Sequence, residues 1–415
     1  MTSFAVQSFG CRVNQAEAFA WTDMLQRHGL VYWSDASRSD IILVNTCTLT
    51  RRADRDVRHF LNKIERVNPE ARVVLTGCYA ERFNGDLHDR HSVWKVIRNA
   101  EKEDLPKRIL ENTPCRTKTE VKPFRSRALV KIQDGCDFRC SFCIIPYVRG
   151  KSFSVPEDDI LQRIRAYIQQ GYKEIVLTGI HLCSYGNERP GPGSLACLLQ
   201  RMEGIEGLGR IRLSSLDPRF MDRELRDTIT QSPIVCPHFH LSLQHGSDDV
   251  IQRMGRRIKV EDYRSILADL RQKSPYAALG ADIIVGFPGE KERDFETMAE
   301  FLEQSPLTYF HVFSYSPRPG TPASRWKQVD EKTKKKRSAH LRILSRKKNL
   351  RFRRNLVADV QDGVVIKKKD GTAQVLTSNY VPVKVSGCEF VEREQVRVRI
   401  TQVEEKTTLG QAVDG

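Results

Sequence analysis

Three cysteines lie within the nine residues GCDFRCSFC, residues 135–143, with the spacing C-x3-C-x2-C. A closed structural zinc site takes four protein ligands, and disulfides use cysteines in pairs. Three thiolates from one loop instead fit a [4Fe–4S] cluster in which three irons have protein ligands and the fourth is open. Zinc with three cysteines is an alternative, but the loop offers no obvious fourth ligand. The spacing therefore predicts a metal centre with a vacant coordination position.

Three more cysteines, Cys11, Cys47 and Cys78, each follow a short apolar run: VQSFGC, LVNTC and VLTGC. The carboxyl ends of neighbouring parallel strands share one edge of a sheet, where ligands collect. The three thiols are therefore expected to converge on a second cluster, although three unrelated buried cysteines would show the same local pattern. The other cysteines show no ligand spacing and are interpreted as packing residues or free thiols: Cys115, Cys183, Cys197, Cys236 and Cys388.

The apolar pattern predicts an α/β fold with three domains. In residues 1–118, the runs FAVQSF, IILVNT and RVVLT alternate with helical patterns such as NQAEAFAWTDMLQRHG, which ends at Gly29 and indicates a parallel α/β domain. In residues 122–352, helical segments separate six strand candidates, which favours a partial (β/α)6 barrel with its chemistry at the carboxyl ends of the strands. The candidates are ALVKI, EIVLT, RIRLSS, HFHLSL, LGADIIVG and TYFHVF.

The hydropathy pattern is different in residues 355–415. Apolar and polar residues alternate there, and Asp-Gly turn signals occur at 362 and 370. This pattern predicts a small antiparallel β-barrel, a fold that often carries oligonucleotides on one face.

A basic connector precedes this last domain. The chain has a formal net charge of +16, and the stretch KTKKKRSAHLRILSRKKNLRFRR, residues 332–354, holds twelve Lys and Arg with no Asp or Glu. Such a segment favours polyanions through phosphate contacts and counterion release. A solvated helix face is the alternative, although like charges one turn apart destabilise a helix.

The amino-terminal residues MTSFAVQSFG lack the pattern of a signal peptide, and no apolar run is long enough for a membrane span. We therefore expect a cytoplasmic protein that binds no membrane, with reduced cysteines.

Taken together, these features resemble the radical S-adenosylmethionine (SAM) methylthiotransferases over essentially the whole chain. The resemblance rests on FGCRVNQAE, VNTCTLTRRAD, TGCYAER, KIQDGCDFRCSFCIIPYVRG, HLSLQHGSD, ADIIVGFPGE and FSYSPRPGTPAS, followed by a TRAM-type β domain. It implies two [4Fe–4S] clusters, one on Cys136, Cys140 and Cys143 and the other on Cys11, Cys47 and Cys78. It also implies that Phe142 lies against the adenine of SAM.

The resemblance implies an enzyme that uses two SAM molecules per turnover, one as methyl donor and one as the source of a 5′-deoxyadenosyl radical. Three substrates compete within the family: isopentenyladenosine in tRNA, an aspartate of a ribosomal protein, and N6-threonylcarbamoyladenosine beside the tRNA anticodon. FGCRVNQAE, CTLTRRAD and YFHVFSYSPRPGTPAS are most similar to the third branch. An RNA-binding iron–sulfur redox sensor without catalysis is the alternative from another class.

Further residues are weaker candidates. Polar residues at predicted strand ends are candidates to hold SAM, although each also suits a cap or turn: Thr178, Gly179, Ser214, Ser215, Gln244 and Asp282. Candidate RNA contacts are Arg149, Arg318, Lys334, Lys335, Lys336, Arg337 and Tyr380. The expected partners are the tRNA anticodon loop, an electron donor such as flavodoxin or ferredoxin, and a sulfur source.

Overall fold

The structure is a computed structural model that describes residues 2–83, 87, 93–111, 113, 124–188 and 193–413. The chain forms two compact units, each assembled from segments that are distant in sequence. Unit 1 contains residues 1–124, 134–152 and 316–321, and unit 2 contains residues 125–133, 153–315 and 322–415. The predicted boundary near residue 118 and Cys115 lie outside the described residues, and the three-domain division stays a prediction.

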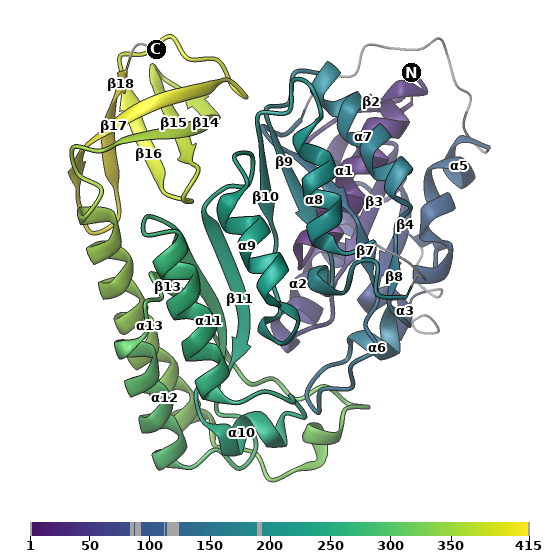
Figure 1. Cartoon of the computed structure of the whole chain (residues 1–415). Coiled ribbons are helices and arrows are strands. Elements are labelled where there is room, and N and C mark those ends of the chain that lie inside the picture. Colours follow the sequence, from purple (N-terminus) through teal and green to yellow (C-terminus); the bar gives the residue numbers. More distant parts are fainter. Residues whose placement is uncertain are drawn as a thin grey trace. The chain divides into compact units, whose positions relative to one another are not determined.

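A five-stranded parallel sheet with the order β2-β1-β3-β4-β5 forms the centre of unit 1 (Figure 1). Its strands are β1 Ser3–Ser8, β2 Val31–Tyr32, β3 Ile41–Thr46, β4 Arg72–Gly77 and β5 Val93–Val96. The helices of unit 1 are α1 Arg12–Arg27, α2 Arg51–Val67, α3 Cys78–Arg82, α5 Leu105–Leu110 and α6 Ile145–Val148, with the 3-10 turns η1 Ala36–Arg38 and η2 Asn99–Asp104.

Both faces of this sheet are covered, as the continuous apolar strands require. On β3, Ile41 and Leu43 join one core with Trp21 of α1. The alternate residues Ile42 and Val44 join the opposite core with residues of α2. Because successive side chains of a strand point to opposite faces, the run IILVNT can stay fully buried only between two helical layers.

Six parallel strands of unit 2 form two three-stranded sheets with the orders β10-β9-β6 and β11-β12-β13. Isolated bridges Ile211–Val235 and Leu216–Leu241 lie where the two sheets meet. The strands are β6 Ala128–Lys131, β9 Glu174–Thr178, β10 Arg210–Leu213, β11 His238–Gln244, β12 Ala278–Val285 and β13 Tyr309–Ser314. The six predicted strands and the predicted partial barrel are confirmed.

Helices separate these strands in sequence, as the βα repeats predicted. They are α7 Glu157–Gln169, α8 Leu195–Glu203, α9 Arg223–Gln231, α10 Asp248–Arg253, α11 Val260–Lys273 and α12 Glu292–Gln304, with η3 Leu182–Ser184, η4 Pro218–Phe220 and η5 Pro322–Arg325. The short strands β7 Gln133–Asp134 and β8 Phe153–Ser154 flank the cysteine loop in sequence. No helix in the described ranges combines the length and apolar content needed to cross a bilayer.

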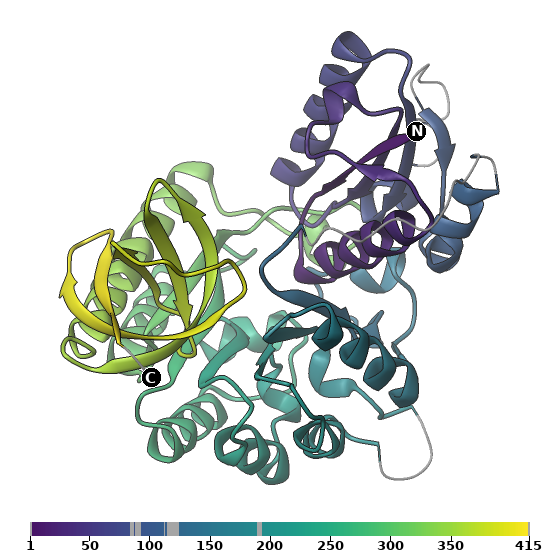
Figure 2. The same ribbon diagram turned by 90° about the horizontal axis from the view of Figure 1, so that it is seen from above.

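The C-terminal strands close into a five-stranded barrel with the order β14-β15-β16-β18-β17, seen in Figure 2. They are β14 Val360–Lys369, β15 Thr372–Thr377, β16 Pro382–Ser386, β17 Gln395–Val403 and β18 Thr408–Val413. The predicted barrel is confirmed, with one parallel pair, β16 with β18, among its antiparallel pairs.

Only one of the two Asp-Gly signals makes a turn in this barrel. Asp370 and Gly371 join β14 to β15, and their positive φ angles of 49° and 70° are those of a tight hairpin turn. The predicted turn at residue 362 is wrong. Asp362 and Gly363 instead continue β14 and pair with β17, and a side chain on Gly363 would collide with Val375 of the neighbouring strand.

The basic connector forms one long helix, α13 Glu331–Arg354, which packs against β13 and leads into the C-terminal barrel (Figure 1). Lys334 and Arg337 face inward, although most of the basic side chains are exposed. Arg337 is paired with Glu290 at 2.6 Å and with Glu292 at 2.7 Å.

A buried ion cluster fastens the C-terminal barrel to the strands of the central barrel. The fully buried Glu174 of β9 accepts hydrogen bonds from Arg212 at 2.8 Å and from Arg210 at 2.7 Å. Arg210 also donates to the carbonyl of Leu376 at 2.8 Å, and Arg212 donates to that of Thr377 at 3.1 Å. Burial opposes ionisation of Glu174, but the guanidinium groups of Arg212, Arg210 and the partly exposed Arg127 outweigh it and lower its pKa from 4.5 to about 2.

We expect Glu174→Gln to lower the free energy of unfolding by about 3–5 kcal/mol, because two buried guanidinium groups lose their carboxylate. Urea unfolding followed by circular dichroism measures this loss. The folded pKa lies below the ordinary value, so the stabilisation is fully present above pH 4.5 and is lost as the pH falls through about 2.

The exposed Glu206→Gln on the same unit is the matched control and should change stability by less than about 0.5 kcal/mol. Equal effects of the two substitutions at neutral pH would contradict a structural role for Glu174.

Candidate active site

Cys11, Cys47 and Cys78 follow three adjacent strands of the unit 1 sheet. Cys11 comes after β1 and precedes α1, Cys47 follows β3 directly, and Cys78 begins α3 immediately after β4. Because β1, β3 and β4 are neighbouring parallel strands, all three cysteines lie at the carboxyl edge of one sheet. Their role as cluster ligands stays a prediction.

The loop that carries Cys136, Cys140 and Cys143 also belongs to unit 1. Its form is fixed by backbone hydrogen bonds from Cys136 N–H to the Gly150 carbonyl at 3.1 Å and from Cys143 N–H to the Cys140 carbonyl at 3.0 Å. Helix α6, which follows the loop, contacts α3, which begins with Cys78. All six predicted ligands are therefore in one compact unit.

The thiols influence one another electrostatically. Burial, followed by the charges of the nearby Cys11 and Cys78, raises the pKa of Cys47 to about 12. Burial likewise raises the pKa of Cys143 to about 12, and among its other causes are Cys140, Cys136 and, from the other triad, Cys78. Such thiols are protonated at neutral pH, so only a strongly cationic ligand makes them thiolates.

Arg149, just after α6, connects the cysteine loop to the sheet. Its buried guanidinium donates to Glu17 at 3.2 Å, to Asp134 at 2.6 Å and to the Cys78 sulfur at 3.3 Å, and also to Asn14. Burial opposes its charge, but Glu17, Cys78 and Asp134 keep the pKa of Arg149 well above its usual value. Hydrogen bonds to ligand sulfurs are one means by which proteins tune iron–sulfur clusters.

Lys102 completes this buried network with a contact to Glu17 at 2.6 Å and a longer approach to Asp134 at 3.9 Å. Two cations thus face two anions. Sequence reasoning did not identify Asn14, Glu17, Lys102 or Asp134. Asn14 and Glu17 lie three and six residues after Cys11 on α1, and this helical spacing was the one available signal.

The spacing of potential ligands favours clusters over a lone zinc ion. Within the described part of the chain, one group of three has all its ligand atoms within 4.8 Å of one another: His240, Asp282 and His311. The cysteines form no such group, although a tetrahedral zinc with sulfurs at about 2.3 Å requires one. A cluster takes its three cysteines on three different irons and so fits more widely separated thiols.

Gly10 lets the Cys11 turn approach Cys47 closely. A Cβ atom at Gly10 would lie 2.5 Å from both Cβ and Sγ of Cys47, and the backbone there has a φ of +93°. No other residue type fits this conformation and this contact without displacement.

Most of the predicted SAM contacts lie together at the carboxyl end of the central barrel, in unit 2. Thr178 ends β9 and Gly179 follows it, Ser214 and Ser215 follow β10, and Gln244 ends β11. The Ser214 hydroxyl is buried without a partner among the described residues, and Gln244 has a φ of 74°, which is strained for a residue with a side chain. Both features suit a ligand-binding strand end, and the assignment of these residues to SAM stays a prediction.

Asp282 differs from this group because it lies inside β12. Its carboxylate oxygen Oδ1 lies 3.0 Å from His240 Nε2 and 3.3 Å from His311 Nδ1. Burial opposes its ionisation, but these two imidazoles outweigh burial and lower the pKa of Asp282. Its carboxylate is therefore engaged within the barrel.

Four of the predicted RNA contacts are buried in ion pairs. Arg149 and Arg337 have the partners described above, Lys334 contacts Glu331 at 3.0 Å, and Arg318 pairs with Asp54 at 2.6 Å. Arg318 also donates to the Thr48 carbonyl, one residue beyond Cys47, at 3.2 Å. These positions do not fit RNA contact, because protein groups already occupy the charged ends. Lys335 and Lys336 are exposed, and Tyr380 is half-buried.

Comparison with known proteins agrees with this architecture. Residues 130–302 match the Radical SAM superfamily, and residues 3–98 match the uncharacterized protein family UPF0004. The solved structure of the radical SAM methyltransferase TsrM from Kitasatospora setae has a TM-score of 0.57, with 14% identity over 78% of this chain and 77% of that one. The chain therefore has a radical SAM fold, and that superfamily uses a [4Fe–4S] cluster with SAM.

Curated relatives extend over nearly the full length. The threonylcarbamoyladenosine tRNA methylthiotransferase MtaB of Aquifex aeolicus is 36% identical, covering 95% of this chain and 99% of its own. The MtaB of Thermotoga maritima is 34% identical, covering 86% of this chain and 85% of its own. The chain belongs to the radical SAM methylthiotransferase family, as its motifs predicted.

We expect Gly10→Ala to displace Cys47 and so to prevent binding of the predicted second cluster while leaving the cluster of the C-x3-C-x2-C loop. Anaerobically reconstituted protein should then contain about four irons per chain instead of about eight. Iron and sulfide analysis measures the difference.

Gly371→Ala is the matched control, because Gly371 also has a positive φ, +70°, but no atom lies within 4 Å of the added Cβ. It shares the backbone strain without the collision and should keep the full iron content. A full iron content in Gly10→Ala would contradict the second cluster site.

Proposed function

We propose that this protein is a tRNA methylthiotransferase that inserts a methylthio group at C2 of N6-threonylcarbamoyladenosine beside the anticodon. The observation that carries the proposal is the presence of two cysteine triads in one compact unit of a chain that matches methylthiotransferases over nearly its full length. The names of those relatives support this substrate above isopentenyladenosine or a ribosomal-protein aspartate.

The chemistry explains why two centres are needed. An aromatic C2–H bond has no acid–base route to a C–S bond at neutral pH, so the hydrogen must leave as an atom. When bound, a [4Fe–4S] cluster and SAM supply a 5′-deoxyadenosyl radical for this step. In the proposal, Cys136, Cys140 and Cys143 hold that cluster, and Phe142 lies against the adenine of SAM.

The residues of unit 2 hold the rest of the SAM molecule in this proposal. The unpartnered Ser214 hydroxyl and the strained Gln244 support binding at this end of the barrel, together with Thr178 and Gly179. A second SAM per turnover provides the methyl group.

Cys11, Cys47 and Cys78 would hold the second cluster in this proposal, and that cluster would supply a binding position for the sulfur to be inserted. Arg149 supports this assignment, because its guanidinium contacts the Cys78 sulfur and would stabilise a thiolate there. The same residue also reaches Asp134, two residues before the radical-forming loop. Arg149 is thus a positioning residue for both triads.

The reaction requires an electron donor, such as flavodoxin or ferredoxin, and a source of sulfur. In this proposal the protein acts in the cytoplasm on an anticodon loop, which presents the unpaired base that the chemistry needs.

We expect the variant with Cys11, Cys47 and Cys78 all changed to Ala to form 5′-deoxyadenosine but no methylthio nucleoside, because only the radical-forming cluster remains. Cys136→Ala should abolish both products. The assay is anaerobic incubation with SAM, dithionite and tRNA from a strain that lacks the enzyme, followed by mass spectrometry of nuclease digests.

Absence of 5′-deoxyadenosine from the unsubstituted protein would instead favour a non-catalytic redox sensor. Formation of methylthio-isopentenyladenosine in place of the threonylcarbamoyl product would contradict the substrate, and leave the enzyme class intact.

The exposed residues of α13 bind phosphates of the tRNA in this proposal. Lys335→Gln with Lys336→Gln should weaken tRNA binding and reduce the slope of log Kd against log salt concentration by about one for each phosphate that is no longer neutralised. Fluorescence anisotropy at several salt concentrations measures the slope. Lys63→Gln with Lys107→Gln removes the same charge from exposed positions of unit 1 and is the control. An unchanged slope in the α13 variant would identify that face as merely solvated.

A further inference from the structure

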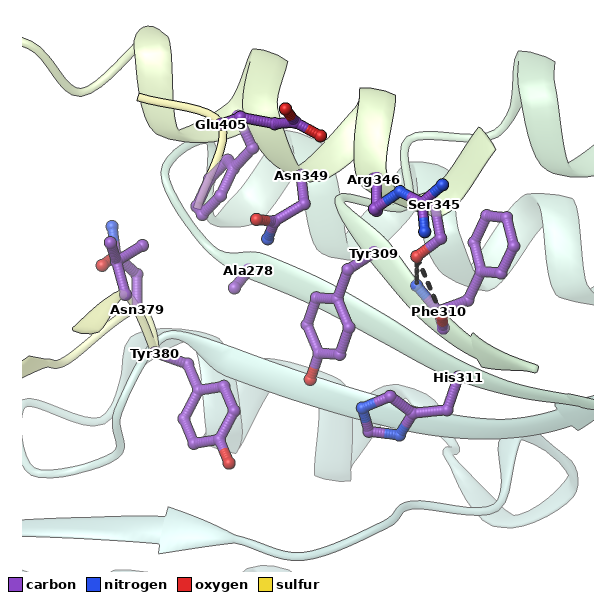
Figure 3. A pocket seen from close by; sticks show the side chains of 12 residues that line it. Ala278, Tyr309, Phe310, His311, Ser345, Arg346, Asn349, Asn379, Tyr380 and Glu405 are labelled. Atoms are coloured by element: carbon purple, nitrogen blue, oxygen red, sulfur yellow. Dashed lines mark hydrogen bonds between the residues drawn. The ribbon is translucent and has the colours of Figure 1, made fainter. Parts of the chain in front are cut away.

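A cavity of about 320 Å³ lies among the central barrel, α13 and the C-terminal barrel, all within unit 2. Its volume is at the lower end of the range for small-molecule pockets. Figure 3 shows the Tyr309 ring in the middle of the lining residues. The lining includes aromatic, amide and basic groups, chiefly Tyr309, Tyr380, His311, Asn349, Asn379 and Arg346.

The cavity is distant along the strands from the candidate SAM residues. Ala278 and Tyr309, which line it, are the first residues of β12 and β13. Ser214 and Gln244 lie at the carboxyl ends of β10 and β11. In parallel strands these are opposite ends of the barrel, so the cavity is separate from the carboxyl-end site.

An aromatic stack fixes the orientation of the two tyrosine rings. The His238 ring stacks on Tyr380 with ring centroids 4.1 Å apart, and the nearly parallel Tyr309 ring lies beside both, 6.1 Å from His238 and 6.5 Å from Tyr380. The Tyr309 hydroxyl contacts His238 Nε2 at 2.7 Å. The rings are therefore held in place before any ligand arrives, which reduces the entropy lost on stacking.

Tyr380 adopts an unusual backbone conformation to take part in this stack. Its φ is +68°, a left-handed value that bulky residues rarely adopt. The turn is held by hydrogen bonds from Tyr380 N–H to the Thr377 carbonyl and from Thr377 N–H to the Val381 carbonyl, both 3.0 Å. Such conformations occur preferentially at functional sites.

The cavity also offers polar groups with unused capacity. Asn349 accepts a hydrogen bond from Arg353 at 2.9 Å through its oxygen, and its amide NH2 has no partner among the described residues. Arg346 is exposed and likewise has no hydrogen bond or ion pair in the described part of the chain. Glu405 is the one acidic residue in the lining.

The surrounding charge favours a polyanion. Arg342, Arg346 and Lys347 are exposed on α13, in the segment that contains no acidic residue after Glu331. A flat aromatic face, an amide donor and an adjacent cationic helix are the groups that bind a base, its edge and its phosphate in single-stranded RNA.

We propose that this cavity binds one unpaired nucleotide of the RNA substrate, with its base on Tyr309 and its phosphate near Arg346. It would be a nucleotide other than the one that reacts, because the cavity lies at the opposite end of the barrel strands from the candidate SAM residues. The inference rests on the proposed tRNA substrate and adds a second point of recognition. Two anchored nucleotides would fix the register of the loop, whereas phosphate contacts alone would let it slide.

The test measures binding of a fluorescent anticodon stem-loop RNA to the cluster-loaded protein. Tyr309→Leu removes the aromatic face, and Asn349→Trp fills the cavity without removing either tyrosine. Each should weaken binding about 10-fold, as expected for the loss of one stacked base. Neither substitution removes a charge, so the salt dependence of Kd should stay the same.

Tyr276→Leu is the matched control, because Tyr276 is 67% exposed and does not line the cavity. Thermal unfolding of each variant shows whether it is folded. As a direct readout, stem-loops with a single 5-iodouridine should cross-link to Tyr309 or Tyr380 from one loop position.

Unchanged affinity in folded Asn349→Trp, or cross-links that map only to other residues, would overturn the proposal. The proposed function is tested separately, by whether the unsubstituted protein forms the methylthio nucleoside. The two proposals can therefore fail independently of each other.

Discussion

The buried guanidinium of Arg149 is the interaction on which the arrangement of unit 1 depends. It bridges helix α1, the end of β4 and the loop with the C-x3-C-x2-C spacing, and it does so in surroundings where an unpaired charge is very costly. Lys102 balances the second carboxylate, so the network is neutral as a whole. Because the network is neutral and its hydrogen bonds fix its geometry, it can hold the loop of residues 135–143 close to the end of β4.

Local patterns were sufficient to predict the elements of the fold. The predicted strand IILVNT and the predicted helix ERDFETMAEFLEQ coincide with β3 and α12. A continuous apolar run predicts the strand and a helical period of apolar residues predicts the helix, and both patterns can be recognised from neighbouring residues. The placement of Cys11, Cys47 and Cys78 just after strands was also predictable from adjacent residues, whereas the role of the six cysteines as ligands stays a prediction. Pairings across long sequence distances, such as Asn14 with Arg149, cannot be recognised from neighbouring residues. At Gly363 the Asp-Gly pair predicts a turn, but the glycine instead allows close packing against Val375 of the neighbouring strand.

Helix α13 illustrates the difficulty for charged segments. Positions 334, 337 and 341 share its inner face, but two of the three are basic, so the sequence resembles a uniformly solvated helix. The inward charges are satisfied by Glu290, Glu292 and Glu331, two of them more than forty residues away. The basic residues of such a segment can therefore be sorted into those paired within the fold and those available to a ligand only when their partners are known. Among the available ones, Arg346 lines the aromatic cavity, so one helix contributes both to the core and to the surface proposed to bind RNA.

Unit 1 is completed by residues 316–321, which are translated long after its first segment. Its first segment ends at residue 124, so about two hundred residues must leave the ribosome before the last piece arrives. At ordinary synthesis rates that interval is roughly 10–40 s. During this time the Thr48 carbonyl and the Asp54 carboxylate lack their partner Arg318. The contacts of Arg318 with the segment that follows Cys47 therefore form only after most of the central barrel has been translated, much later than the five strands of the sheet, which lie within residues 3–96.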